Sequence, residues 1–119
     1  MPRDNPVEAK SFAFAVRSVR CYQHLMHKTD TAPIAKQFVR SATSIGANVA
    51  EAQEAQSHAD FCAKLTIALK EAHETDYWLR LMAATGILTP AESDSLRTDC
   101  GELLALLTSI LKTARRRQR

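Results

Sequence analysis

Glycine and proline are scarce in this chain of 119 residues, which contains 3 Gly and 4 Pro. β-Sandwiches, β-barrels and glycine-rich nucleotide-binding folds need such residues at frequent turns, so the scarcity argues against all three classes. Helix-favouring residues, such as alanine, leucine, lysine and arginine, are abundant. With 45% hydrophobic and 24% charged residues, the composition is typical of a globular protein. The sequence therefore predicts a single all-helical domain.

Long hydrophobic runs are also missing. The longest apolar stretch, Leu103 to Leu111, contains Thr108 and Ser109 and is far shorter than the ~20 residues that cross a bilayer. Near the N-terminus, Asp4 and Glu8 stand where a signal peptide would be apolar. The 3 cysteines are an odd number without CxxC spacing, which indicates reduced thiols. We expect a cytoplasmic protein without a membrane partner.

The common catalytic and metal-binding motifs are absent. There is no P-loop, no G-x-S-x-G turn and no pair of Glu-x-x-His motifs for a di-iron site. His73 and Glu74 resemble the start of a zinc-protease motif that lacks its second histidine. Cys21 and His24 could share a metal ion on one helix, but no fourth ligand is visible, so a buried thiol beside surface histidines (His24, His27) is the preferred interpretation. We expect no metal, no cofactor and no enzymatic activity.

Apolar residues recur at helical spacing in four segments. They predict helices at approximately residues 7–28, 33–55, 58–85 and 90–115, followed by a basic tail at 115–119 that we expect to be disordered. The sharpest local signal is Thr89-Pro90-Ala91-Glu92, which has the pattern of a capping box with proline in the first helical turn. Short breaks between helices of similar length predict an antiparallel up-down-up-down four-helix bundle.

The first predicted helix has two apolar lines. One consists of Phe12, Val16, Val19, Tyr22 and Met26. The other consists of Phe14, Cys21 and Leu25. An apolar stripe this wide predicts that the helix contacts more than one neighbour.

Charge is distributed unevenly along the chain, although the net charge is only +3. Residues 1–48 hold seven basic and three acidic side chains, residues 49–102 hold four basic and ten acidic, and residues 103–119 hold five basic and none acidic. This asymmetry indicates either a polyanionic partner or head-to-tail contact between copies. The candidate nucleic-acid-binding residues are Arg17, Arg20, Lys28, Arg115, Arg116, Arg117 and Arg119. A solvated helix face and a favourable interaction with a helix C-terminus remain the alternative interpretation.

A polar line follows one side of the second predicted helix, where Arg40, Ser44, Asn48 and Glu51 are spaced by four, four and three residues. Such a line forms either a recognition row or a set of hydrogen bonds across a helix seam. We favour the second interpretation, with Asn48 setting the register, because an arginine and a glutamate on one face usually pair.

Two adjacent aromatic residues, Tyr77 and Trp78, cannot share one helix face with Leu79. At least one of them must point away from the core of its own subunit. An exposed aromatic side chain of this size indicates a subunit contact.

The run from Arg40 to Ala52, RSATSIGANVAEA, resembles the signature of the four-helix-bundle proteins related to the 23S ribosomal RNA intervening-sequence protein. That family has R-S-A-x-S-I-x-x-N-I-A-E-G followed by an F-x-x-x-L helix, which Phe61 and Leu65 match. The resemblance extends from about Phe12 to Leu111, and its clearest departure is Ala52 in place of the usual glycine.

The resemblance implies an all-helical subunit that assembles into a ring, typically a homopentamer. Relatives include the accessory variability determinant of diversity-generating retroelements, which binds nucleic acid and a reverse transcriptase. It also implies that the matching residues are structural or lie at subunit interfaces: Arg40, Ser44, Asn48, Glu51 and Glu74. The aromatic pair Tyr77 and Trp78 joins them as interface candidates, because at least one of the two rings must be exposed.

Three functional hypotheses remain at this point. The first is a non-enzymatic oligomer that binds RNA or DNA, or serves as an accessory to a reverse transcriptase. The second is a ring scaffold that binds another protein or a small ligand, because the acidic middle of the chain would repel phosphates. The third is an enzyme that uses Glu51, Glu74 or His73 at a subunit interface, although nothing locates a substrate.

Overall fold

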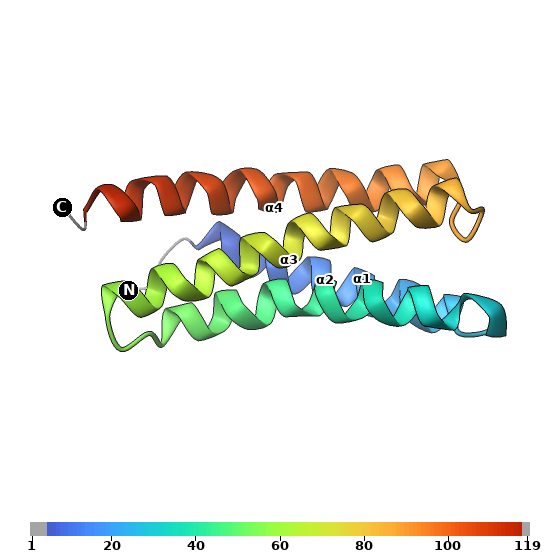
Figure 1. Cartoon of the computed structure of the whole chain (residues 1–119), viewed down its shortest axis with the longest axis horizontal. Coiled ribbons are helices and arrows are strands. Elements are labelled where there is room, and N and C mark those ends of the chain that lie inside the picture. Colours follow the sequence, from blue (N-terminus) through green and yellow to red (C-terminus); the bar gives the residue numbers. More distant parts are fainter. Residues whose placement is uncertain (1–4, 118–119) are drawn as a thin grey trace.

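The computed structural model describes residues 5–117, which form four long α-helices and one short 3₁₀ turn (Figure 1). Their bounds are α1 Pro6–Leu25, η1 Thr29–Thr31, α2 Ala32–Gln53, α3 His58–Ala84 and α4 Pro90–Arg116. Arg115 and Arg116 are therefore helical, and the predicted disorder of the tail is wrong for these two residues. Arg119 lies outside the described residues.

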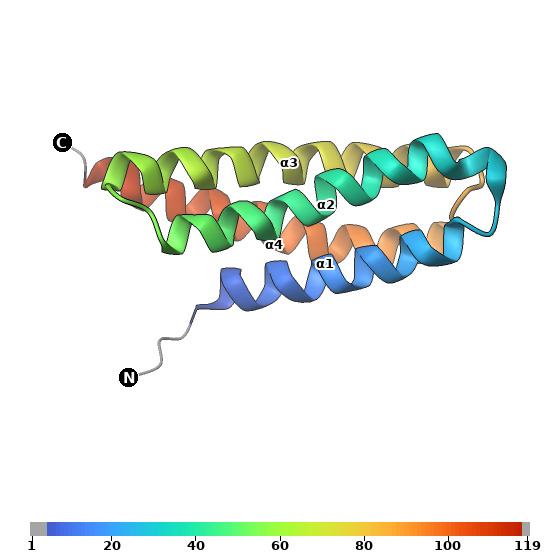
Figure 2. The same ribbon diagram turned by 90° about the horizontal axis from the view of Figure 1, so that it is seen from below.

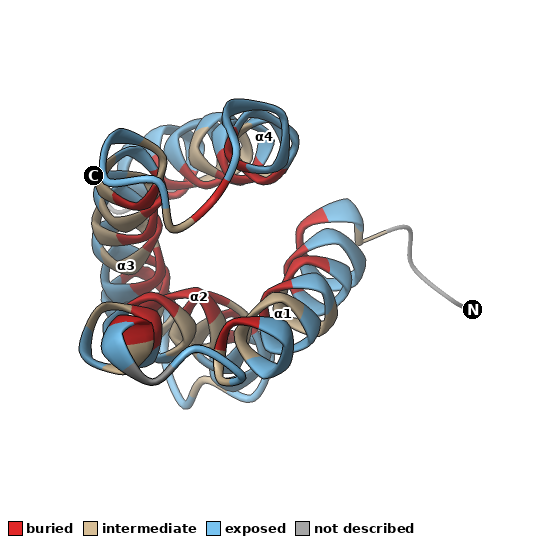
Figure 3. Cartoon of the chain, turned by 90° about the vertical axis from the view of Figure 1, so that its right-hand side faces the viewer, coloured by how far each residue is buried: buried red, intermediate tan, exposed pale blue. Residues whose placement is uncertain are grey.

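Each helix packs against the next in antiparallel order, which confirms the predicted bundle (Figures 1 and 2). The bundle is elongated, with extents of 48 × 23 × 23 Å. Viewed from one end, the buried residues of all four helices face inward, and α2 and α3 lie between α1 and α4 (Figure 3). The contact between α1 and α4 is the least extensive of the four that join neighbouring helices.

Side-chain caps define where the helices begin. The Ser57 hydroxyl accepts a hydrogen bond from the Asp60 amide at 3.0 Å, and Thr89 and Glu92 form both bonds of the predicted capping box, at 2.8 and 3.1 Å. The first helix ends at Leu25, three residues earlier than predicted. The Thr31 hydroxyl hydrogen-bonds the carbonyls of Leu25 and Lys28, at 3.1 and 2.8 Å, and so satisfies groups that a longer helix would have bonded internally.

The buried face of α1 differs from the main predicted apolar line. Its buried residues are Val7, Ser11, Phe14, Ser18 and Leu25. Phe12 is 71% exposed and Val19 is 37% exposed, so the first part of this apolar line faces away from the core, whereas Tyr22 packs against it. Both lines have helical spacing, and the serines at 11 and 18 are small enough to let α2 approach closely. A Cβ atom at Gly46 of α2 would lie 3.2 Å from the Ser11 carbonyl oxygen.

No helix within residues 5–117 has both the length and the apolar character that crossing a membrane requires.

Candidate functional site

The seam between α2 and α3 is closely packed. Its fully buried apolar residues are Phe38, Ala42, Ile45 and Val49 from α2 and Leu65, Ala68, Ala72 and Leu79 from α3. The hydroxyls of Ser41 and Thr75 lie 2.9 Å apart inside it and hydrogen-bond each other. Alanine at several of these positions brings the backbones together, so the apolar part of the seam leaves no room for a ligand.

A charged cluster borders this seam on the outside. The guanidinium of Arg40 on α2 pairs with Glu71, at 3.4 Å, and with Glu74, both on α3. The Trp78 indole donates a second hydrogen bond to Glu74, at 3.0 Å. The indole bond, followed by Arg40, lowers the pKa of the Glu74 carboxyl. Glu74 therefore acts as a charged link between two helices and has the wrong protonation state for a general acid.

The remaining residues of the predicted polar line bond locally. The Ser44 hydroxyl donates to the Arg40 carbonyl at 2.7 Å, and the Asn48 amide donates to the Ser44 carbonyl at 2.8 Å, both within α2. Glu51 pairs with Lys64 of α3 at 3.1 Å. Arg40 and Glu51 thus each meet α3 rather than each other, and Asn48 makes no hydrogen bond across the seam to another described residue.

Tyr77 is the aromatic residue that points outward. It is 50% exposed, whereas Trp78 is partly buried against the core. The two rings meet edge to face with centroids 5.2 Å apart, and the Arg80 guanidinium lies 5.8 Å from the centroid of the Tyr77 ring. Ile67 is also exposed on α3, and Leu81 is half-buried. We call Ile67, Tyr77, Trp78 and Leu81 the α3 outer face.

A second apolar surface lies on α1. Phe12, Val16 and Val19 form what we call the α1 outer face, and Val16 is half-buried. Together with Ala15, Arg20 and Gln23, they line a shallow hollow of about 450 Å³. Exposed apolar side chains that gather around a hollow are typical of a contact surface.

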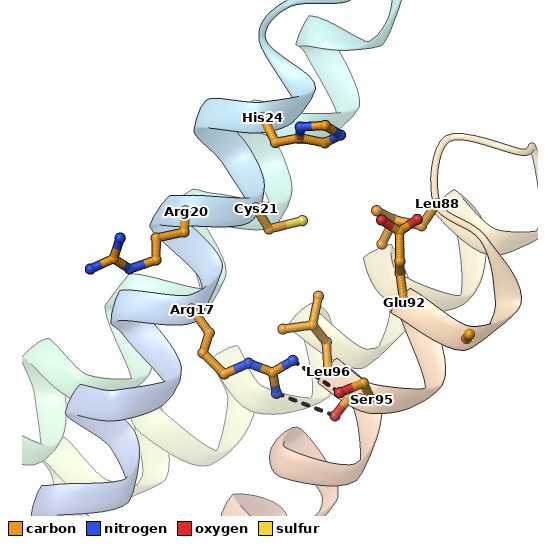
Figure 4. Close-up of a pocket in the computed structure, with 9 residues that line it drawn as sticks. Arg17, Arg20, Cys21, His24, Leu88, Glu92, Ser95 and Leu96 are labelled. Atoms are coloured by element: carbon orange, nitrogen blue, oxygen red, sulfur yellow. Dashed lines mark hydrogen bonds between the residues drawn. The ribbon is translucent and has the colours of Figure 1, made fainter.

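A wider opening separates α1 from α4, and we call it the α1–α4 cleft (Figure 4). Its volume is about 560 Å³, which is within the usual range for ligand pockets. Its lining consists of Arg17, Arg20, Cys21 and His24 from α1, Leu88 before α4, and Ala91, Glu92, Ser95 and Leu96 from α4. Cys21 and His24 point into the opening, whereas Arg20 points away from it.

Polar contacts between α1 and α4 span the rim of this cleft. The Arg17 guanidinium donates to the Ser95 hydroxyl at 2.9 Å (Figure 4). It also pairs with Asp99. Further along the same two helices, Lys10 pairs with Glu102 at 3.0 Å. All four charged side chains are substantially exposed, so their net contribution to stability is small.

Two ionisable groups in the cleft have pKa values that are shifted in opposite directions. Burial, followed by the nearby Glu92 charge, raises the pKa of the Cys21 thiol. The hydrogen bond from the Thr89 backbone lowers the pKa of Glu92. The thiol is therefore protonated and the carboxyl ionised at neutral pH, which is not the state of an activated nucleophile. Within residues 5–117, no three His, Cys, Asp or Glu side chains are arranged to hold a metal ion.

The predicted cationic residues fall at opposite ends of the bundle. Arg17, Arg20 and Lys28 lie toward the end where α1 stops, whereas Arg115 to Arg117 lie at the end of α4 (Figures 1 and 2). They do not form one surface within a subunit. Arg17 is neutralised by Asp99, and Arg115 donates to the Thr66 hydroxyl at 3.1 Å. Among the described residues, Arg115, Arg116, Arg117 and Lys112 have no ion-pair partner.

The sequence matches the family model of the 23S rRNA-intervening sequence protein over residues 3–109, which is most of the chain. The chain belongs to this family. A crystal structure of a protein of unknown function from the S23 ribosomal protein family of Bacteroides thetaiotaomicron is 49% identical in sequence. The similarity covers 89% of this chain and 98% of that protein, with a TM-score of 0.86. No curated protein matches the chain.

The signature of the intervening-sequence protein family lies on α2 and contributes to two seams. Its arginine, Arg40, forms the ion-pair cluster with α3, and Gly46 lies where α1 approaches closely, whereas Ala47 and Ala50 are exposed. The α1–α4 cleft was not predicted from the sequence. A signal was present, because Arg17, Cys21 and His24 follow one another at helical spacing beside the buried line of α1. Nothing in the sequence paired that line with Ser95 and Asp99.

Proposed function

We propose that this family member is a non-enzymatic homo-oligomer that binds nucleic acid through the C-terminal end of α4. The observation that carries the proposal is the cluster of Lys112, Arg115, Arg116 and Arg117, which have no ion-pair partners among the described residues. Cations that are not already paired are free to replace the counterions of a phosphate backbone. Phe61 is the aromatic residue that lines a hollow with Arg117, and it is partly buried against the core, which favours backbone contact over stacking of successive bases.

Self-association is supported by the two outer faces. Phe12 is 71% exposed and Tyr77 is 50% exposed, and each has further apolar side chains beside it on its helix face, as is common at contact surfaces. The proposed assembly is a ring, with five subunits as the expected number. In a cyclic ring every copy would place its cationic α4 end on the same rim, so the subunits would bind a polyanion together.

The test is binding of a fluorescein-labelled RNA duplex, and separately of a DNA duplex of the same sequence, over a range of salt concentrations. We expect the logarithm of the affinity to fall linearly with the logarithm of the salt concentration. Replacing Arg115, Arg116 and Arg117 by glutamine should reduce that slope by ~2–3, because each phosphate contact contributes about 0.7–0.9.

A matched control removes three cations at the other end: Arg20→Gln, Lys28→Gln and Lys36→Gln. It changes the net charge equally, and we expect a smaller loss of affinity. Absence of binding at low salt would refute nucleic-acid binding. An equal loss in both variants would show that overall charge, and not the end of α4, is responsible.

The α1–α4 cleft favours a second candidate function, a scaffold that holds a small ligand with an apolar body. Leu88 and Leu96 form an apolar floor, with Arg17 and His24 on the α1 side and Glu92 on the α4 side, while Arg20 points away from the opening. The anionic aromatic dye 1-anilinonaphthalene-8-sulfonate is a suitable probe. Binding should be lost in Ala91→Trp, which fills the cleft, and kept in the control Ala105→Trp, an exposed position on α4 outside it. Equal dye binding by both variants would place the dye elsewhere.

A further inference from the structure

The two outer faces lie on different helices, and this determines how copies can meet. α1 and α3 are not neighbours in the bundle, because α2 lies between them on one side and α4 on the other (Figure 3). A contact between two different surfaces is head-to-tail, and it leaves each copy with one free face of each kind. Repetition then yields a ring or a fibre rather than a two-fold dimer.

Their heights along the bundle also match. α1 and α3 run in the same direction and finish at the same end of the molecule (Figures 1 and 2). Val19 lies six residues before the end of α1, and Tyr77 lies seven residues before the end of α3. At ~1.5 Å per residue, this difference in position corresponds to only about 2 Å. Rotation about an axis parallel to the bundle preserves height, so these two side chains are level between adjacent copies.

The shapes are complementary as well. The α1 outer face has a hollow of about 450 Å³, lined by Val16 and Val19, while the α3 outer face has the projecting ring of Tyr77. Phe12 and Ile67 lie 13 and 17 residues before their helix ends, so they follow in the same order toward the other end. An exposed aromatic side chain on one face and a hollow on the other allow apolar surface to be buried when the two faces meet.

Both faces border α2, which favours closure into a ring. On α1, the hollow includes Ala15, one turn beyond Ser11, whose carbonyl approaches Gly46 of α2. On α3, Trp78 hydrogen-bonds Glu74, which pairs with Arg40 of α2. Both faces are therefore turned toward the α2 side of the bundle. Each added copy is then rotated in the same sense about the ring axis, and its α2 faces that axis.

The contact area explains why one contact between two copies would be too small for a stable complex. A helix of 20 residues such as α1 is about 30 Å long and ~10 Å wide, so one face offers roughly 300 Å². Stable complexes usually bury about 800 Å² per partner. In a closed ring every subunit makes two such contacts, so release of a subunit must break both at once.

We infer that the α1 outer face of one copy receives the α3 outer face of the next, in parallel orientation and at equal height, with Tyr77 seated in the hollow beside Val19. This inference rests on the proposed self-association and specifies its surfaces. The partner is a second copy of the same chain.

Cysteine cross-linking of the full chain tests it. In a Cys21→Ser background, the remaining native cysteines, Cys62 and Cys100, are buried. Gln23→Cys lies at the edge of the α1 outer face, and Ala84→Cys lies near the same height on α3; both positions are exposed. With a short bismaleimide, a mixture of the two variants should give a species of twice the subunit mass, and neither variant alone should give it. A chain with both substitutions should give a ladder that stops at the ring size.

Ala63→Cys is the matched control, because it is exposed on α3 but lies 21 residues before the helix end. At ~1.5 Å per residue it is about 30 Å from the level of Gln23, so the mixture of these two variants should not cross-link. Cross-linking of that mixture, or of either single variant alone, would overturn the inference by showing an antiparallel or two-fold contact.

Light scattering of the unmodified chain distinguishes failure of the proposed self-association from failure of the proposed α1–α3 pairing. A single-subunit mass at high protein concentration would refute self-association itself, and with it the proposed assembly. A multimeric mass without cross-linking between Gln23→Cys and Ala84→Cys would leave self-association intact and refute the pairing of α1 with α3.

Discussion

The α2–α3 seam and the α1–α4 seam join helices of similar length in the same bundle, yet they are held by different forces. In the first, alanines bring the backbones together, and a buried hydrogen bond joins Ser41 to Thr75. In the second, exposed ion pairs span the rim, and a cleft of about 560 Å³ remains open. Close packing excludes ligands and resists opening, whereas a polar rim tolerates both. The α1–α4 side is therefore open beside the middle of the bundle, whereas the α2–α3 side is open only at its loop end, where Glu51, Ser57 and Lys64 line a hollow of about 790 Å³.

Thiol labelling gives the largest expected difference between the two sides. Cys21 lines the cleft and is half-buried, whereas Cys100 is fully buried, and burial raises its pKa to about 12. At pH 8, iodoacetamide should modify Cys21 at least ~10³-fold faster, because Cys100 reacts only when the bundle unfolds. Mass spectrometry of the peptides measures both rates. Similar rates would mean that α4 separates from α3 as readily as the cleft admits solvent.

Matched leucine-to-alanine substitutions compare packing directly. Leu79→Ala on α3 should lower the free energy of unfolding by about 3–5 kcal/mol, because the closely packed core cannot collapse into the space. Leu96→Ala on α4 should cost roughly half as much, since that side chain already borders the open cleft. Urea denaturation monitored by circular dichroism measures both. Equal costs, with equal dependence on urea, would refute the difference in packing.

The capping box begins α4 beside the open cleft, and removing it measures how much this cap stabilises the helix. Glu92→Ala should lower the free energy of unfolding by about 1 kcal/mol at pH 7. The folded-state pKa of Glu92 is lowered, so this stabilisation is complete above the ordinary glutamate pKa of about 4.3 and is lost as pH falls through the folded value.

Glu92→Gln is the control for that prediction. Its amide oxygen can still accept the Thr89 hydrogen bond, so most of the stability at pH 7 should return without the acid dependence. Urea titrations at several pH values between 3 and 7 distinguish the variants. An acid dependence that persists in Glu92→Gln would assign it to another carboxyl group.

The rim ion pairs should give the smallest effect. Arg17→Met removes the charge that meets Asp99 but keeps most of the side-chain length, and the expected loss is below ~1 kcal/mol. High salt should remove the difference from the unmodified chain, because exposed charges are screened. A loss of several kcal/mol that persists at high salt would make this seam as strong as that between α2 and α3.

Much of the fold was predictable because it depends on local signals. Thr89 to Glu92 form a capping box through contacts within four residues, and Pro6, Pro33 and Pro90 each lie in the first turn of a helix, where proline is favoured. The end of α1 was predicted less well, since it depends on Thr31, which returns from the next turn to bond Leu25. The partners of Arg40 and Glu51 were also missed. These partners, Glu71, Glu74 and Lys64, lie on α3, more than ten positions away in the sequence. The spacing of residues within α2 carries no information about them.

The sequence by itself determined that this chain forms four antiparallel helices and that it belongs to the 23S rRNA-intervening sequence protein family. Periodicity, caps and a signature along α2 are properties of the chain read in order. Only the tertiary structure decided which apolar line of α1 is buried, because Phe12 and Phe14 are equally hydrophobic. The buried line is the one in which the small Ser11 lets α2 approach closely, and Phe12, Val16 and Val19 are left on the outer side of α1.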